Sequence, residues 1–135
     1  GQKVDLDKYA LFVDGVTSDP SKDYKSFLES LSTLDGEGSN IHRLLTAAVG
    51  ISAEGGEFME IVKKMVFQGK PWNHDNREHL IIELGDVMWY VMQACKALHV
   101  SLDEVIECNV DKLKKRYPGG DFDVHYSENR KEGDR

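Results

Sequence analysis

The sequence predicts an all-α fold, with a four-helix-bundle-like core and a short extra N-terminal helix, assembled as an oligomer. Two long stretches, 41–68 and 75–99, carry apolar residues at the i, i+3, i+4, i+7 spacing of an amphipathic helix, and Leu84 and Leu98 are among those expected on the inner face of the second. No segment of four or more residues alternates convincingly between apolar and polar side chains, as a half-buried strand would. Because antiparallel helices joined by short loops bury their apolar faces against one another, the pattern favours a bundle.

Shorter helices are expected on both sides of this pair. Stretches 5–16 and 22–34 each carry an apolar stripe, and the run 17–21, which contains a proline, separates them. The motif Ser101-x-x-Glu104 is a capping-box signature, and it predicts a last helix that reaches Tyr117.

Length and charge limit the class of protein. The 135 residues predict one domain, 1–135, with a core at about 22–117 and a polar tail at 118–135. Such a core is modest, which favours packing against another subunit. The net charge of -7 argues against nucleic acid or anionic membranes as partners, and no apolar run is long enough for a membrane span. With no signal peptide and two free, helix-buried thiols, Cys95 and Cys108, we expect a cytoplasmic protein.

Two pairs of acidic residues lie on the two long helices, Glu54 with Glu57 and Glu83 with Asp86. A step of three residues turns a helix by about 300°, so the members of each pair share a face. Both faces border an apolar stripe, where clustered carboxylates repel one another unless cations are present. Hard divalent ions with oxygen ligands, usually Mg²⁺, would satisfy them.

Spacing alone leaves a second explanation open, because acidic pairs also occur on solvated helix faces. Glu104-x-x-Glu107 is interpreted in that way. A di-iron bundle is excluded because no histidine has a glutamate three residues before it, and no Cys/His cluster has zinc spacing.

Three polar residues of the last helix, Asn109, Lys112 and Arg116, share one face and form a candidate phosphate-binding stripe. The alternative is that these cations only complement the helix dipole. Tyr90 follows Asp86 by four residues on the same side. Trp72, in the loop between the long helices, is a candidate for stacking on a base or for closing the end of the bundle.

The motif Glu54-x-x-Glu57, followed after 25 residues by Glu83-x-x-Asp86, resembles the signature of the all-α nucleoside triphosphate pyrophosphohydrolases, such as MazG, the dimeric dUTPases and the dCTP pyrophosphatases. The stretches 84–90 and 109–118 resemble the same family. The C-terminal segment 116–130 is similar to that of compact MazG-like proteins from bacteriophages, which implies the host cytoplasm as its location.

This resemblance implies hydrolysis of a (d)NTP to a monophosphate and pyrophosphate. The reaction would depend on Mg²⁺, for which Mn²⁺ could substitute, and the enzyme would be a homodimer or homotetramer. The four acidic residues become metal ligands and catalytic residues. The residues implied to contact the triphosphate or the sugar are Asn109, Lys112, Arg116 and Tyr90. Because the base-binding residues vary across the family, Asn40, His42 and Trp72 are candidates for contacting the base. Many family members have an acidic residue where this chain has Ala53, and Glu60 is a candidate to replace that residue in part. Which glutamate activates the water molecule therefore stays an open question.

Two other functions are weighed against this one. The first is hydrolysis of another pyrophosphate-linked nucleotide, such as an alarmone, and the second is a catalytically silent helical adaptor. An adaptor would gain nothing from unpaired carboxylates beside its core. A nucleic-acid-binding module is disfavoured by the pI of about 5.2.

Overall fold

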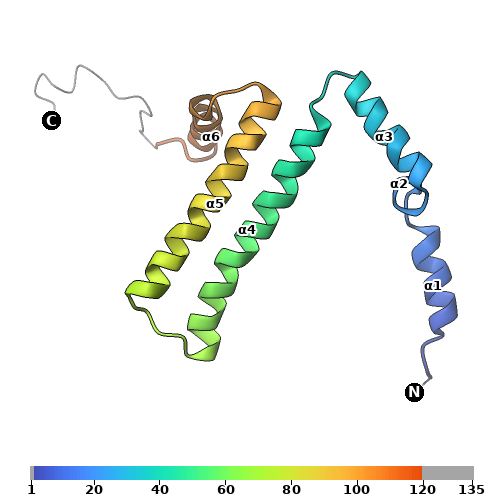
Figure 1. The fold of residues 1–135 in the computed structure, drawn as a ribbon, viewed down its shortest axis with the longest axis horizontal. Helices are drawn as coiled ribbons and strands as arrows, with labels where there is room; N and C mark the ends of the chain where they lie inside the picture. The colour runs from blue at the N-terminus through green and yellow to red at the C-terminus, as the bar shows by residue number, and fades with distance from the viewer. Residues whose placement is uncertain (1, 120–135) are drawn as a thin grey trace, which may run out of the picture. The chain divides into compact units, whose positions relative to one another are not determined.

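A computed structural model describes residues 2–119, and its regular elements over that range are all helices (Figure 1). Their bounds are α1 Leu6–Gly15, α2 Asp19–Lys22, α3 Tyr24–Gly36, α4 Ile41–Gln68, α5 His74–Leu98 and α6 Leu102–Arg116. The predicted all-α fold is therefore confirmed. Most of the predicted polar tail, residues 120–135, lies outside the described part. No helix within 2–119 is long and apolar enough to cross a lipid bilayer.

The chain divides into two compact units, and the first comprises residues 1–41 with helices α1 to α3. Aspartates begin two of these helices: Asp5 accepts a hydrogen bond from the Lys8 amide at 3.1 Å, and Asp23 accepts one from the Ser26 amide at 2.9 Å. The run 17–21 was expected to separate two helices, but its last three residues begin the single-turn helix α2. Pro20 does not prevent this, because proline is tolerated in the first turn of a helix. No residue of these helices is buried.

The second unit begins at His42 and holds α4, α5 and α6. Helices α4 and α5 run antiparallel, side by side, joined by a short connection (Figure 1). Asn73 caps α5 by accepting from the Asn76 amide at 2.9 Å, and the buried Asn76 side chain donates to the Pro71 carbonyl at 2.6 Å. These bonds hold the turn between the helices, and Gly69 supplies its positive φ of 74°.

One glycine of α4 lies directly against a side chain of α5. The ring of Tyr90, on α5, lies where a Cβ atom at Gly50 would be, so only glycine fits without displacing the ring. Gly55 and Gly56 have no such neighbour, since a Cβ atom there would meet nothing within 4 Å.

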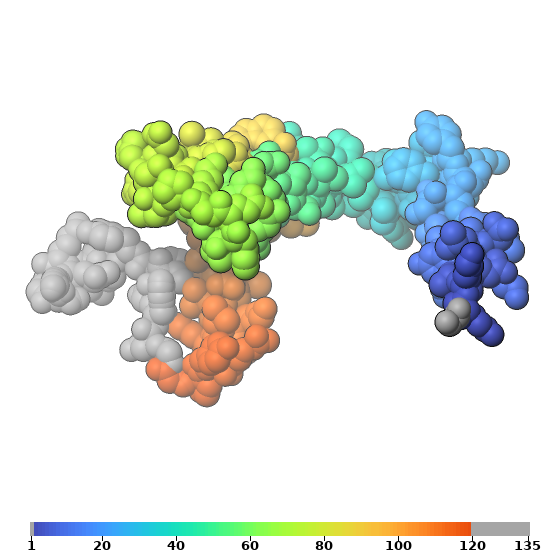
Figure 2. Space-filling model, turned by 90° about the horizontal axis from the view of Figure 1, so that it is seen from below, coloured from blue at the N-terminus to red at the C-terminus, as the bar shows by residue number. Residues whose placement is uncertain are grey.

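Helix α6 begins with the predicted capping box. The Glu104 amide donates to Ser101 Oγ at 3.1 Å, and the Ser101 amide donates to Glu104 Oε1 at 3.3 Å. Figure 1 shows α6 nearly end-on beside α5, and Figure 2 shows its C-terminal part projecting away from the long helices. Because α6 runs across the α4–α5 pair, this unit does not by itself contain four aligned helices, and the four-helix bundle stays a prediction.

The apolar core within one chain is small. Four apolar residues of the described part are buried, namely Ala47, Ile61, Cys95 and Ala97. Leu84 and Leu98, expected on the inner face of α5, are 53% and 56% exposed, and Cys108, also expected to be buried, is exposed. Some residues that helical periodicity places on an apolar face are therefore exposed to solvent in a single chain.

Replacing Gly50 with alanine should lower the melting temperature, which circular dichroism can follow. Overpacking costs about 1–3 kcal/mol, whereas alanine gains about 1 kcal/mol over glycine in a helix interior. The matched control is Gly55→Ala, where the new methyl group meets open space and the melting temperature should rise slightly. Shifts in the same direction for both variants would contradict the Gly50–Tyr90 contact.

Candidate functional site

Three carboxylates from the two long helices converge on one point. Glu54 of α4 and Glu83 and Asp86 of α5 each offer an oxygen, and these oxygens all lie within 4.8 Å of one another. Glu83 and Asp86 share a face because they are three residues apart, and the antiparallel packing of α4 brings Glu54 opposite them. We call these three residues the carboxylate cluster.

The side chain of Glu83 is largely enclosed. It is 13% exposed, and its Oε1 lies 3.4 Å from Nε2 of His79, one helical turn earlier. Its Oε2 is buried and has no hydrogen-bond partner within the described part of the chain. Buried polar atoms are nearly always paired, so this carboxylate oxygen is a candidate for binding a cation.

The neighbours of Glu54 in the cluster raise the pKa of its carboxyl group. When Glu54 is protonated it shares a side-chain hydrogen bond with Glu83, which two ionised carboxylates cannot form, and this bond raises the pKa of Glu54 above its ordinary value. Desolvation and the charges of Glu83, Asp86 and Glu57 raise this pKa further. A raised carboxyl pKa means that the ionised form is disfavoured in the fold. The stability that this costs grows as pH rises from the ordinary value through the raised one.

The donor set fits a hard divalent cation such as Mg²⁺ or Mn²⁺. It consists of carboxylate oxygens, carries several negative charges and includes the orphaned oxygen of Glu83. A bound cation would offset the repulsion that raises the pKa of Glu54. Glu54, Glu83 and Asp86 are therefore the residues that could hold the metal.

Glu57, the fourth predicted ligand, lies outside the 4.8 Å group. It is exposed on α4, one turn after Glu54. Its charge nevertheless contributes to raising the pKa of Glu54, so it belongs to the same electrostatic neighbourhood. A ligand role for Glu57 stays a prediction.

A pocket of about 320 Å³ adjoins the cluster and is lined by Glu54, Asp86, Trp89 and Tyr90. The two aromatic rings meet edge to face, with centroids 4.9 Å apart and an interplanar angle of 85°. The structure thus places Tyr90 in the same pocket as Glu54 and Asp86, and a contact of Tyr90 with substrate stays a prediction. It also adds Trp89, which the sequence reasoning missed although it follows Asp86 by three residues and so shares its helix face.

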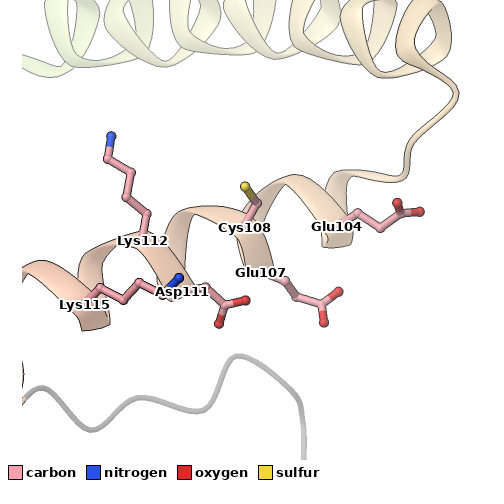
Figure 3. A pocket seen from close by; sticks show the side chains of 6 residues that line it. All are labelled: Glu104, Glu107, Cys108, Asp111, Lys112 and Lys115. Atoms are coloured by element: carbon pink, nitrogen blue, oxygen red, sulfur yellow. The ribbon is translucent and has the colours of Figure 1, made fainter.

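The phosphate-binding stripe lies on α6, where Asn109, Lys112 and Arg116 are all exposed. Figure 3 shows the side chains that line a second pocket, of about 470 Å³, on this helix: Glu104, Glu107, Cys108, Asp111, Lys112 and Lys115. In that view Lys112 points towards α5, while Glu107 and Asp111 point away from it. Lys112 is therefore directed to the side of α6 on which the long helices lie.

Two of the three candidates for contacting the base, His42 and Trp72, lie apart from this pocket. His42 lies at the start of α4, about 18 Å along the helix axis from Glu54, and Trp72 lies beyond the opposite end of α4. Trp72 is 67% exposed. Asn40 belongs to the first unit. Neither His42 nor Trp72 lines the pocket beside the cluster, so the substrate roles of these three residues stay predictions.

A pair of antiparallel helices that presents clustered carboxylates beside an aromatic-walled pocket defines a helical protein suited to metal-assisted chemistry on a small ligand. Residues 43–120, more than half of the chain, match the model of the MazG nucleotide pyrophosphohydrolase domain, and the chain belongs to that family. It is also 38% identical over 87 residues to the "Gene 37 protein" of Mycobacterium phage L5, a match that covers 63% of this chain and 75% of that protein. No solved structure matches.

Family membership points to a nucleotide pyrophosphohydrolase, and the relative supports a compact, phage-type MazG-like protein, as the sequence motifs predicted. The matched range begins just after the first unit ends, so α1 to α3 lie outside the family domain.

Proposed function

We propose that this protein hydrolyses nucleoside or deoxynucleoside triphosphates to the monophosphate and pyrophosphate in a reaction that requires Mg²⁺. Water attacks the α-phosphorus, the bond from that phosphorus to the α,β-bridging oxygen breaks, and pyrophosphate leaves. Such a reaction would contribute to control of the nucleotide pool.

The observation that supports this proposal best is the carboxylate cluster with its orphaned oxygen. Three acidic side chains meet within 4.8 Å, and Oε2 of Glu83 is buried without a partner in the described chain. An unpaired buried carboxylate destabilises a fold, so a chain that only joined other proteins would gain nothing from it. The family match supplies the class of substrate.

In the proposed reaction, residues at three places in the second unit have different roles. A divalent cation, when bound, would polarise phosphate oxygens and lower the pKa of a water molecule. Glu54, Glu83 and Asp86 would hold that cation, and Trp89 and Tyr90 would line the space that the nucleoside enters. Asn109, Lys112 and Arg116 would bind the triphosphate, because ammonium and guanidinium groups are strong phosphate donors.

A panel of the four dNTPs and four NTPs, assayed with and without Mg²⁺, tests the proposal. We expect monophosphate and pyrophosphate in equal amounts, and no turnover in excess EDTA. In ¹⁸O-labelled water the label should enter the monophosphate, because water attacks the α-phosphorus.

Other results would contradict it in distinct ways. Label in the pyrophosphate would place the attack at the β-phosphorus, and release of orthophosphate would indicate a different reaction. Turnover of an alarmone but of no triphosphate would favour the alternative hydrolase. No turnover of any nucleotide with Mg²⁺ or Mn²⁺ would favour the silent adaptor.

We also propose that the protein acts as a homodimer or homotetramer. Many large apolar side chains of the second unit are exposed in the single chain, including Val66 at 66%, Phe67 at 79%, Ile82 at 61% and Trp89 at 58%. Monomers rarely expose large contiguous apolar surface, so a second copy is the natural cover. Light scattering should give at least twice the 15.3 kDa mass of one chain, whereas a monomeric mass would contradict this assembly.

A further inference from the structure

The two oxygens of the Glu83 carboxylate have different surroundings. Oε1 lies 3.4 Å from Nε2 of His79, while Oε2 is buried and has no hydrogen-bond partner in the described chain. His79 precedes Glu83 by four residues, so both side chains share one face of α5. Both residues of this contact therefore come from the same helix.

A carboxylate group turns easily about its last torsion, because rotation between sp³ and sp² carbons has broad minima. Glu83 has Glu54 and Asp86 as close neighbours, and both repel it when ionised. The imidazole of His79, within ion-pair distance of Oε1, would oppose that repulsion and favour one rotation of the carboxylate. Groups that orient ligands in this way commonly accompany metal sites.

We propose that His79 is a positioning residue, which holds Glu83 through Oε1 and thereby leaves Oε2 for the divalent cation. The inference rests on the proposed function, because it presupposes that the cluster binds a metal. It gives His79 no contact with the nucleotide or the reacting atoms. An N–H donor at Nε2 suffices for the role.

Manganese affinity tests the proposal without relying on turnover. Mn²⁺ binding would be measured by calorimetry or electron paramagnetic resonance, at one pH and ionic strength, for wild type, His79→Ala and His79→Gln. Loss of such an orienting partner typically weakens metal binding by 10- to 100-fold, so we expect His79→Ala to raise the Mn²⁺ Kd by about tenfold or more. His79→Gln, whose amide keeps an N–H donor, should restore most of the affinity.

The control variant is His74→Ala, which removes an exposed histidine from the first turn of the same helix. Its Mn²⁺ affinity should equal that of wild type. Because the His79 side chain is 50% exposed, the melting temperature of the metal-free protein should change little in His79→Ala. Nucleotide turnover by His79→Ala should recover when the Mn²⁺ concentration is raised in proportion to the Kd.

Each failure has its own meaning. A wild-type Kd in His79→Ala, while wild type binds Mn²⁺, would overturn the role of His79 and leave the proposed function standing. A loss that glutamine does not restore, or a large drop in metal-free melting temperature, would show that the imidazole only packs against the helix, and would also overturn it. If wild type binds no Mn²⁺ and turns over no nucleotide, the proposed function fails, and the role of His79 with it.

Discussion

Replacing Glu83 with glutamine should lower kcat/KM for the preferred nucleotide by about 10³-fold or more, because metal polarisation of a phosphate contributes several kcal/mol and about 1.4 kcal/mol is a factor of ten. The substitution keeps the shape of the side chain and removes the charge of the enclosed carboxylate, whose Oε2 is orphaned. Asp86→Asn should have an effect of the same order, since Asp86 completes the cluster. Steady-state pyrophosphate release measures both.

The fold of these variants should persist. Removing one charge relieves the repulsion that raises the pKa of Glu54, so the metal-free melting temperature should hold or rise. The control is Glu104→Gln, because glutamine also serves in a capping box and Glu104 lies on α6, outside the cluster. Equal losses of kcat/KM in Glu104→Gln and Glu83→Gln would show that the wrong helix face has been assigned.

Replacing Lys112 with alanine should lower kcat/KM by about 10²-fold, the usual loss when one fixed donor to a developing anion is removed. Negative charge builds on the departing pyrophosphate as the bond breaks, and a fixed cation stabilises that charge more in the transition state than in the ground state. Lys112 points from α6 towards α5 (Figure 3), and Arg116 lies one turn further along the helix. Arg116→Ala should show a similar loss.

Lys114→Ala is the matched control, because two residues turn a helix by about 200° and place Lys114 on the opposite face from Lys112. Its kcat/KM should stay close to that of wild type. If Lys112→Ala and Arg116→Ala also have the kcat/KM of wild type, these two cations only complement the dipole of α6. Other cations, such as Lys64 or Lys70, would then bind the phosphates.

The helices themselves followed from local rules that the sequence displays. Apolar spacing placed α4 at 41–68, as observed, and α5 to within a residue, and Ser101-x-x-Glu104 marked the start of α6. Glu83 and Asp86 were assigned to one face because i, i+3 spacing fixes the angle between two side chains on any α-helix. The exception was α2, a single turn in which proline occupies a permitted position.

Contacts between elements needed the tertiary structure. Helical periodicity predicts an apolar face, but it does not say which residues of that face are buried within a single chain. Leu84 and Leu98 were therefore expected to face inward, although both are exposed. The register of α4 against α5 decides that Glu54, rather than Glu57, joins Glu83 and Asp86.

Residue types and their spacing along one chain were enough to identify the helices, the acidic pairs and the family. The packing of Tyr90 on Gly50, the place of Trp89 in the pocket beside the carboxylates and the unpaired oxygen of Glu83 became visible in the folded chain. Those features arise where two helices meet. Their distances depend on the offset and rotation of one helix against the other, which helical spacing within either segment does not specify.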